Sequence, residues 1–232
     1  MDTADITGAL TLTTSGMVNT GNLSSTTGVT VSSAGAATLG TLTSSTGNIS
    51  ATSATSLTTG NATATSGTIT LTAASGITTG ALTGADVSLA NPMGTITTGL
   101  ITSSNGFTLN TPSALNLVGV TSTTGDIAIT STAAGASSVG NLAANAATGD
   151  ISVSAATLTV GSSSAGATTA LTSTVGDLTT GAVTSGSNAS LTSAGALTTG
   201  NITSTTGSIS LDAGGTELTT GPISALQDFK VK

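Results

Sequence analysis

The stretch "LTTGNITSTTGSISL", residues 197–211, carries the pattern that decides the fold. Nearly the same phrase, "LTTGNATATSGTITL", occupies residues 57–71, and a shorter form, "ITTGALTGADVSL", occupies residues 77–89. Each copy alternates apolar and small polar residues on both sides of a Gly. Alternation with a period of two is typical of a short strand that is buried on one face. Repetition of the whole phrase indicates one structural unit stacked many times.

The Gly that closes the "LTTG" phrase marks the repeat along the chain. Successive markers lie 19 to 21 residues apart, and the ten steps from the first to the last cover 200 residues. We expect these glycines at corner turns, with positive φ. The markers are Gly21, Gly40, Gly60, Gly80, Gly99, Gly119, Gly140, Gly161, Gly181, Gly200 and Gly221.

An apolar pair, separated by one small residue, recurs in nearly every unit. The weakest unit is residues 161–175, where only Leu171 clearly fills an apolar position. The longest spacing runs from Ile127 to Ile151, and we expect the extra length of "NLAANAATG", residues 141–149, to bulge from one corner. The pairs are Leu10/Leu12, Val29/Val31, Ile49/Ala51, Ile69/Leu71, Val87/Leu89, Phe107/Leu109, Ile127/Ile129, Ile151/Val153, Ala189/Leu191 and Ile209/Leu211.

This pattern predicts an all-β fold, a β-solenoid of about eleven coils of roughly 20 residues each. Helix is disfavoured, because β-branched Thr, Val and Ile dominate and Gly recurs throughout. Like residues stack on like in a solenoid, which explains why the chain repeats itself. We expect residues 1–226 to form a single solenoid domain and residues 227–232 a C-terminal tail or cap.

The composition excludes several classes of function. Charged residues make up 5% and aromatic residues 1% of the chain, which has no His, Cys, Trp or Tyr. Common zinc sites, thiol nucleophiles and His-assisted serine triads are therefore ruled out. The net charge of −7 leaves no basic patch for nucleic acid. We expect a protein that is not an enzyme, uses no cofactor and does not insert into a membrane, since no run approaches roughly 20 apolar residues.

Units such as "AGALTTGNITSTTGSISLDAGG", residues 194–215, resemble the repeats of filamentous-haemagglutinin-type two-partner-secretion exoproteins. The resemblance covers nearly the whole chain and lies in its pattern and composition. It implies a right-handed parallel β-helix, export through an outer-membrane pore protein, and a place outside or on the surface of a Gram-negative bacterium. The family's secretion domain is not recognisable, so we expect a segment of a larger protein.

Three acidic residues share one position of the repeat, directly before the first residue of the apolar pair. Asp86, Asp126 and Asp150 lie there, as do Asn48 and Asn188. Stacked carboxylates are weak candidates for a Ca²⁺ site, because Ca²⁺ takes oxygen ligands from flexible loops. The alternative is that these residues simply make the turn into the strand. The same position also accepts Gly, Thr and Ser, which favours the turn.

The sequence holds two further surface candidates. Outward Thr and Ser flank the second apolar residue of the pair, as in Thr11/Thr13, Thr30/Ser32, Ser50/Thr52 and Thr70/Thr72, and such ranks would order water or meet glycan. Five N-glycosylation sequons also occur, a number that the abundance of Ser and Thr gives by chance. They start at Asn22, Asn48, Asn61, Asn188 and Asn201.

The favoured function is a non-enzymatic structural shaft of a secreted adhesin or matrix fibre. Expected partners are further copies of the chain or flanking coils of a longer chain, joined end to end, and a receptor on a host or neighbouring cell. Two alternatives stay open: a surface-binding module for ice or glycan, and a trimeric phage fibre. The exposed backbone at both ends of a parallel stack favours self-association.

Overall fold

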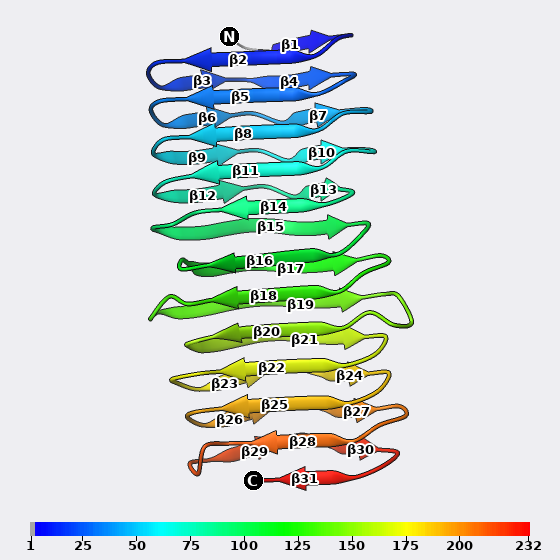
Figure 1. The fold of residues 1–232 in the computed structure, drawn as a ribbon. Coiled ribbons are helices and arrows are strands. Elements are labelled where there is room, and N and C mark those ends of the chain that lie inside the picture. Colours follow the sequence, from blue (N-terminus) through cyan, green and yellow to red (C-terminus); the bar gives the residue numbers. More distant parts are fainter. Residues whose placement is uncertain (1–2) are drawn as a thin grey trace. The chain divides into compact units, whose positions relative to one another are not determined.

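The structure is a computed structural model that describes residues 3–232, and it is built of strands and turns (Figure 1). The chain winds as a β-solenoid of about eleven turns, with about 20 residues from one turn to the next. This confirms the predicted fold class. The described chain divides into two compact units, residues 3–104 with Thr111–Leu117, and Asn105–Asn110 with Val118–Lys232.

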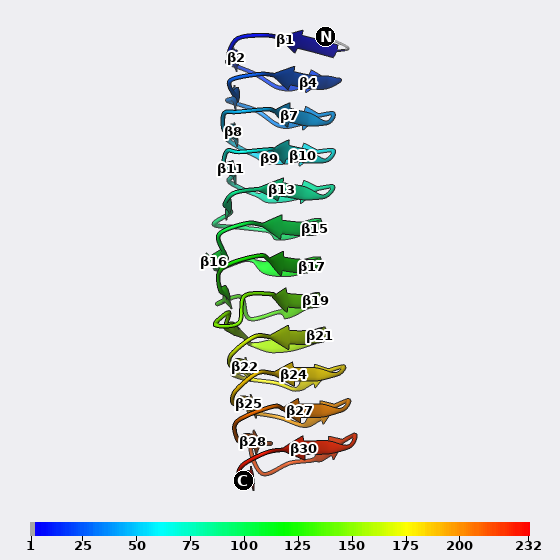
Figure 2. The same ribbon diagram turned by 90° about the vertical axis from the view of Figure 1, so that its right-hand side faces the viewer.

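One strand of each turn is the B strand, which in most turns contains the apolar pair found in the sequence; β2, β8, β11, β16 and β22 are labelled among these strands in Figure 2. B strands pair in parallel with the B strands of neighbouring turns. They are β2 (Leu10–Thr14), β5 (Val29–Ser33), β8 (Ile49–Ser53), β11 (Ile69–Ala73), β14 (Val87–Ala90), β16 (Phe107–Thr111), β18 (Ile127–Ser131), β20 (Ile151–Ala155), β22 (Thr169–Ser173), β25 (Ala189–Ser193), β28 (Ile209–Asp212) and β31 (Phe229–Val231).

Two short strands on either side of the marker Gly complete each turn. The first A strands are β3 (Val18–Thr20), β6 (Ala37–Leu39), β9 (Ser56–Thr59), β12 (Gly76–Thr79), β23 (Leu178–Thr180), β26 (Leu197–Thr199) and β29 (Leu218–Thr220). The second A strands are β1 (Thr3–Ile6), β4 (Asn22–Ser25), β7 (Leu42–Ser44), β10 (Ala62–Ala64), β13 (Leu82–Gly84), β24 (Val183–Ser185), β27 (Ile202–Ser204) and β30 (Ile223–Ala225). In four turns one long strand spans both places: β15 (Thr95–Ser103), β17 (Ala114–Ser122), β19 (Ala136–Ala144) and β21 (Thr157–Ala165).

Equivalent residues of successive turns lie directly over one another. In the N-terminal unit Val29 pairs with Ile49, which pairs in turn with Ile69. In the C-terminal unit Ile127 pairs with Ile151. Each of these side chains is buried, so the inward rows form the core of each unit. A single turn has too little interior to bury its own apolar residues, and stacking supplies about 1.5–3 kcal/mol for each fully buried Val, Leu or Ile.

The long spacing between Ile127 and Ile151 is divided between two corners. Asn145–Asp150 links β19 to β20 with six residues, where Ser45–Asn48 has four, so this corner bulges as expected. The link from β18 to β19 is longer as well, and both loops stand out in Figure 1. The sequence predicts the extra length at the first of these corners only.

The repeat continues further toward the C-terminus than expected. Residues 227–232, predicted as a tail or cap, contain β31, in which Phe229 pairs with Ile209 and Val231 pairs with Leu211. The apolar–polar–apolar order of "FKV" follows the same alternation as the other B strands. This segment therefore forms the last B strand of the C-terminal unit.

Candidate functional site

The Asp and Asn residues at the entry to the B strands, the B-entry column, accept hydrogen bonds from the next turn. The backbone N–H of Asp150 donates to Asp126 Oδ1 at 2.9 Å, and that of Thr168 donates to Asp150 Oδ1 at 2.8 Å. Asn48 and Asn188 accept at 2.9 Å from the backbone N–H groups of Thr68 and Ser208. These side chains therefore join stacked turns, in addition to shaping the turn into the strand.

Of the three carboxylates considered for Ca²⁺, the structure brings together Asp126 and Asp150. Asp86 is exposed and belongs to the N-terminal unit, whereas the other two belong to the C-terminal unit. One oxygen of Asp126 and one of Asp150 is already engaged by a backbone N–H. Across residues 3–232 no group of three or more acidic, His or Cys side chains gathers in a metal-binding arrangement. A Ca²⁺ ion takes six to eight oxygens, so the turn role fits these carboxylates better.

A second column of Asn side chains, the Gly-Asn column, follows the marker Gly. Asn22 Oδ1 accepts from the backbone N–H of Thr41 at 2.9 Å, and Asn61 Oδ1 accepts from that of Ala81 at 2.9 Å. Asn201 has Pro222 at the corresponding place in the next turn, and Pro has no N–H. Sequence reasoning missed this column, although the recurring dipeptide Gly-Asn at 21–22, 60–61, 140–141 and 200–201 signals it.

All five sequon asparagines are exposed, and four of them belong to these columns as acceptors through Oδ1. The nitrogen that glycosylation would modify is the other atom of each amide. Attachment of glycan therefore stays a prediction at Asn22, Asn48, Asn61, Asn188 and Asn201.

The marker glycines are needed for close approach, and the expectation of positive φ at these residues is wrong. Positive φ occurs at Gly28, Gly76, Gly94, Gly106, Gly214 and Gly215, none of which is a marker. A Cβ on Gly200 would lie 2.9 Å from the carbonyl carbon of Gly181, one turn earlier. At Gly200 the adjacent turns therefore lie too close for a Cβ unless the backbone shifts.

Outward Thr and Ser residues stack in columns on the B strands, as predicted. Thr11, Thr30, Ser50 and Thr70 form one column and Thr13, Ser32, Thr52 and Thr72 another. The A strands of the N-terminal unit carry two more regular columns, which sequence reasoning missed. They are Thr38, Thr58, Thr78 and Thr97 on the first A strands, and Thr43, Thr63, Thr83 and Thr102 on the second.

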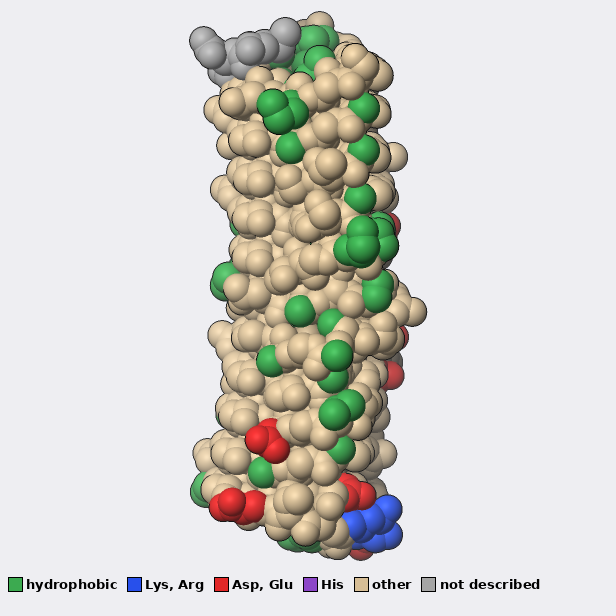
Figure 3. Space-filling view, turned by 90° about the vertical axis from the view of Figure 1, so that its left-hand side faces the viewer, with side chains coloured by type: hydrophobic (Ala, Val, Ile, Leu, Met, Phe, Trp, Pro, Cys, Tyr) green, Lys and Arg blue, Asp and Glu red, His purple; other side chains and the backbone are tan. Residues whose placement is uncertain are grey.

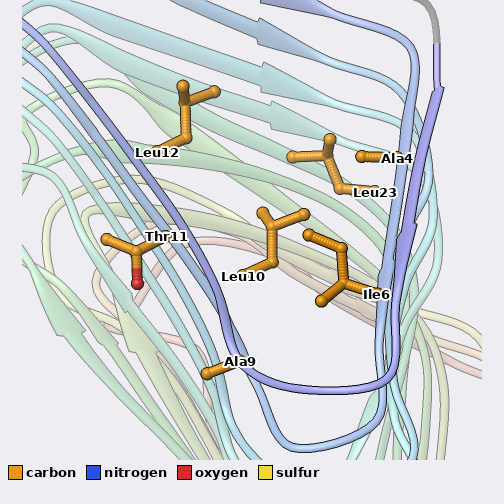
Figure 4. A pocket seen from close by; sticks show the side chains of 7 residues that line it. All are labelled: Ala4, Ile6, Ala9, Leu10, Thr11, Leu12 and Leu23. Carbon is orange, nitrogen blue, oxygen red and sulfur yellow. The ribbon is translucent and has the colours of Figure 1, made fainter.

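One face of the surface, seen in Figure 3, is dominated by small polar side chains and backbone, with scattered hydrophobic side chains. The structure also holds two cavities. One, of about 250 Å³, lies in the first turn between β1 and β2 (Figure 4). The other, of about 370 Å³, lies in the C-terminal unit beside Val175, where the link between β20 and β21 is short. Its lining holds hydroxyl groups and methyl groups without any charged side chain.

No family model, curated protein or solved structure matches this chain. The part of the chain that the structure describes has no helix of the length and apolarity that crossing a bilayer requires.

Proposed function

We propose that this chain is a non-enzymatic structural shaft segment of a secreted bacterial adhesin or extracellular fibre, displayed at the surface of a Gram-negative cell. The observation that carries the proposal is the uniformity of the turns. Inward rows are buried, outward positions hold small polar residues, and the longest corner has only six residues. Chemistry needs convergent reactive groups, whereas a spacer needs only a backbone ladder that repeats.

The resemblance to filamentous-haemagglutinin-type exoproteins supports the location and the export route in this proposal. It rests on units such as residues 194–215. In such a role the solenoid carries other segments away from the cell, and its partners are flanking coils, further copies and a receptor on another cell. The outer-membrane pore protein acts only during export.

Immunogold labelling of intact bacteria that produce the protein from its own gene tests the proposal. Antibody raised against the 232-residue chain is expected to label the outside of intact cells, and protease added to those cells is expected to remove the label. Label that appears only after the cells are broken would contradict it. A cytoplasmic protein of the same cells serves as the control for leakage.

The Thr columns favour a second candidate function, binding to an ordered surface such as ice or glycan. Thr38, Thr58 and Thr78 lie exposed in an unbroken column with the strand spacing of about 4.8 Å. Thermal hysteresis of the isolated protein tests ice binding, and a glycan array tests the other ligand. Loss of either signal in Thr58→Lys would assign it to this column. A trimeric molar mass would instead favour a phage-type fibre.

A further inference from the structure

The corner between β14 and β15 places a carboxamide side chain directly before a proline. Asn91 and Pro92 begin this corner, and Gly94 ends it with a φ of 98° (Figure 1). Asn91 is 3% exposed, whereas Pro92 is exposed. Pro92 has no N–H, so its nitrogen cannot attack the Asn91 side chain to form an imide. The imide-forming reaction that remains is attack by the Asn91 amide nitrogen on its own backbone carbonyl carbon.

That carbonyl already accepts two hydrogen bonds from hydroxyl groups of the next turn. Thr111 Oγ1 donates to the Asn91 carbonyl oxygen at 3.0 Å, and Ser113 Oγ donates to it at 2.7 Å. Both residues are 2% exposed and belong, like Asn91, to the N-terminal unit. Donors held on a carbonyl oxygen away from water stabilise the negative charge that this oxygen gains when a nucleophile adds to the carbon. The two hydroxyls therefore favour cleavage of the Asn91–Pro92 bond.

A similar pair of hydroxyls occurs at a corner where no reaction can follow. The carbonyl of Gly35 accepts hydrogen bonds from Ser33 Oγ at 3.0 Å and Ser53 Oγ at 2.8 Å. Gly35 has no side chain, so nothing in this residue can attack its carbonyl. Asn91–Pro92 is the only Asn-Pro bond in the sequence. The combination of a nucleophile, an activated carbonyl and a proline is therefore specific to one corner.

The side chain of Asn91 is held less firmly than the asparagines of the B-entry column. Its Oδ1 is buried and has no hydrogen-bond partner among the described residues, and its Nδ2 donates to the Thr95 carbonyl at 3.5 Å. Asn48 Oδ1, by contrast, accepts from the Thr68 N–H at 2.9 Å. A buried amide oxygen without a partner is unfavourable where it lies. Rotation of the Asn91 amide toward its own carbonyl therefore sacrifices one long hydrogen bond only.

We propose that the chain cleaves itself between Asn91 and Pro92. Asn91 Nδ2 bonds to the Asn91 carbonyl carbon and closes a succinimide ring, while the bond from that carbon to the Pro92 nitrogen breaks. One hydrogen of Nδ2 leaves to solvent, and the Pro92 nitrogen takes a proton from solvent at its exposed corner, so the step consumes no water. The proximity of Nδ2 to the carbonyl and the two hydroxyl donors lower the barrier. Water later opens the imide at the new C-terminus.

The cut lies in a corner and leaves the strands on both sides of it intact. Strand β14 stays paired with β11, and β15 stays paired with β12 and β13. Backbone hydrogen bonds therefore hold residues 1–91 and residues 92–232 together after cleavage. The two pieces can then separate by unpairing strands, without breaking a covalent bond. The reaction occurs once in each chain, so it does not make the shaft an enzyme, and it does not depend on the proposed function.

Prolonged incubation of the purified 232-residue chain at mildly alkaline pH, followed by mass spectrometry, tests the proposal. Denaturing gels are expected to show two fragments, residues 1–91 and 92–232, while native size-exclusion chromatography shows no change in size. The fragment that ends at Asn91 is expected to be lighter by one water than a hydrolysed end, which distinguishes self-cleavage from a contaminating protease. The bond Thr111–Pro112, at the equivalent corner one turn later, has no carboxamide and is the internal control. A chain that keeps its full mass, or is cut elsewhere, overturns the proposal.

Three variants separate the nucleophile from the two donors. Asn91→Ala is expected to abolish cleavage, and the fold accommodates it because Ala73 holds the equivalent place one turn earlier. Thr111→Val keeps the side-chain shape but removes one donor, and is expected to slow cleavage at least tenfold. Thr111→Ser keeps the hydroxyl and is expected to retain the rate, and urea unfolding of both variants separates a change in rate from a loss of fold. Cleavage in Asn91→Ala overturns the proposal, and equal rates in the two Thr111 variants overturn the role of the hydroxyl.

Discussion

Two turns of the solenoid follow the same backbone path with very different side chains. In the reference coil, residues 57–75, the inward positions of the B strand hold Ile69 and Leu71. In the weak coil, residues 158–175, the same positions hold Thr169 and Leu171. The reference coil has three strands and the weak coil has two, since β21 spans both A places, and all inward strand residues are buried in both coils. The backbone path is therefore set by the whole stack, and an individual turn tolerates polar residues in its core.

The weak coil nevertheless contains unsatisfied polar groups. The hydroxyls of Ser163 and Thr169 are buried and have no hydrogen-bond partner among the described residues. In the reference coil the buried hydroxyl of Thr59 donates to the carbonyl of Gly40 at 3.1 Å. A buried hydroxyl without a partner costs about 1–3 kcal/mol. The comparison indicates that apolar residues of the preceding turn, such as Leu142 and Ile151, stabilise the weak coil.

The largest effect is expected when the reference coil is given the core of the weak coil. Ile69→Thr replaces a buried ethyl group by a hydroxyl between Ile49 and Val87, so we expect a loss of about 3 kcal/mol in the free energy of unfolding. Urea unfolding followed by far-UV circular dichroism measures it. The control is Thr70→Ser on the outward face of the same strand, and an equal loss there would contradict the core assignment.

The next effect concerns the marker glycines. Gly181→Ala places a Cβ against the carbonyl oxygen of Gly161, so the turns must separate, and we expect a loss of about 2 kcal/mol. Gly60→Ala, whose nearest atom is 3.2 Å away, is expected to cost less. Gly135→Ala has nothing within 4 Å and serves as the control. The same unfolding measurement ranks the three, and equal stability of Gly181→Ala and Gly135→Ala would refute the close-approach explanation.

Repair of the weak coil is expected to stabilise the protein. Thr169→Val keeps the shape of the side chain and removes the unsatisfied hydroxyl, so we expect a gain of about 1–2 kcal/mol. The matched control is Thr172→Val in the same strand, at a position that is not fully buried. Hydrogen exchange of the β22 backbone measures the local change. A loss of protection in Thr169→Val would mean that the hydroxyl has a partner.

The smallest effect is expected in the columns of Asx acceptors. Asn188→Ala removes the acceptor of the Ser208 N–H, which we expect to cost about 1 kcal/mol. Asn201→Ala is the control, because Pro222 at the corresponding place in the next turn has no N–H to donate. The difference between the two variants in urea midpoint gives the value of one contact between turns. A loss of stability in Asn201→Ala as large as that in Asn188→Ala would contradict the value assigned to the hydrogen bond between turns.

The repeat length, the parallel stacking and the inward rows could be predicted from the sequence, because the marker Gly and pairs such as Ile69/Leu71 recur in step. The role of Asn48 and Asp126 was only half predicted. Asx residues suggest local turns, whereas the backbone N–H groups that donate to Asn48 and Asp126 lie 20 and 24 residues further along the chain. The marker glycines were misjudged for a similar reason, since close approach depends on the distance between turns. Phe229 was assigned to a tail because Lys230 beside it obscured the alternation.

A crystal structure tests the central claim most directly, namely that the backbone advances one turn for about every 20 residues so that like residues stack. The account predicts that the Cα of Thr58 lies about 4.8 Å from that of Thr78 in a parallel pair, and equally close to that of Thr38. An antiparallel pairing of these strands would contradict it. So would a structure in which Thr58 pairs with residues that are not about 20 positions away in the sequence.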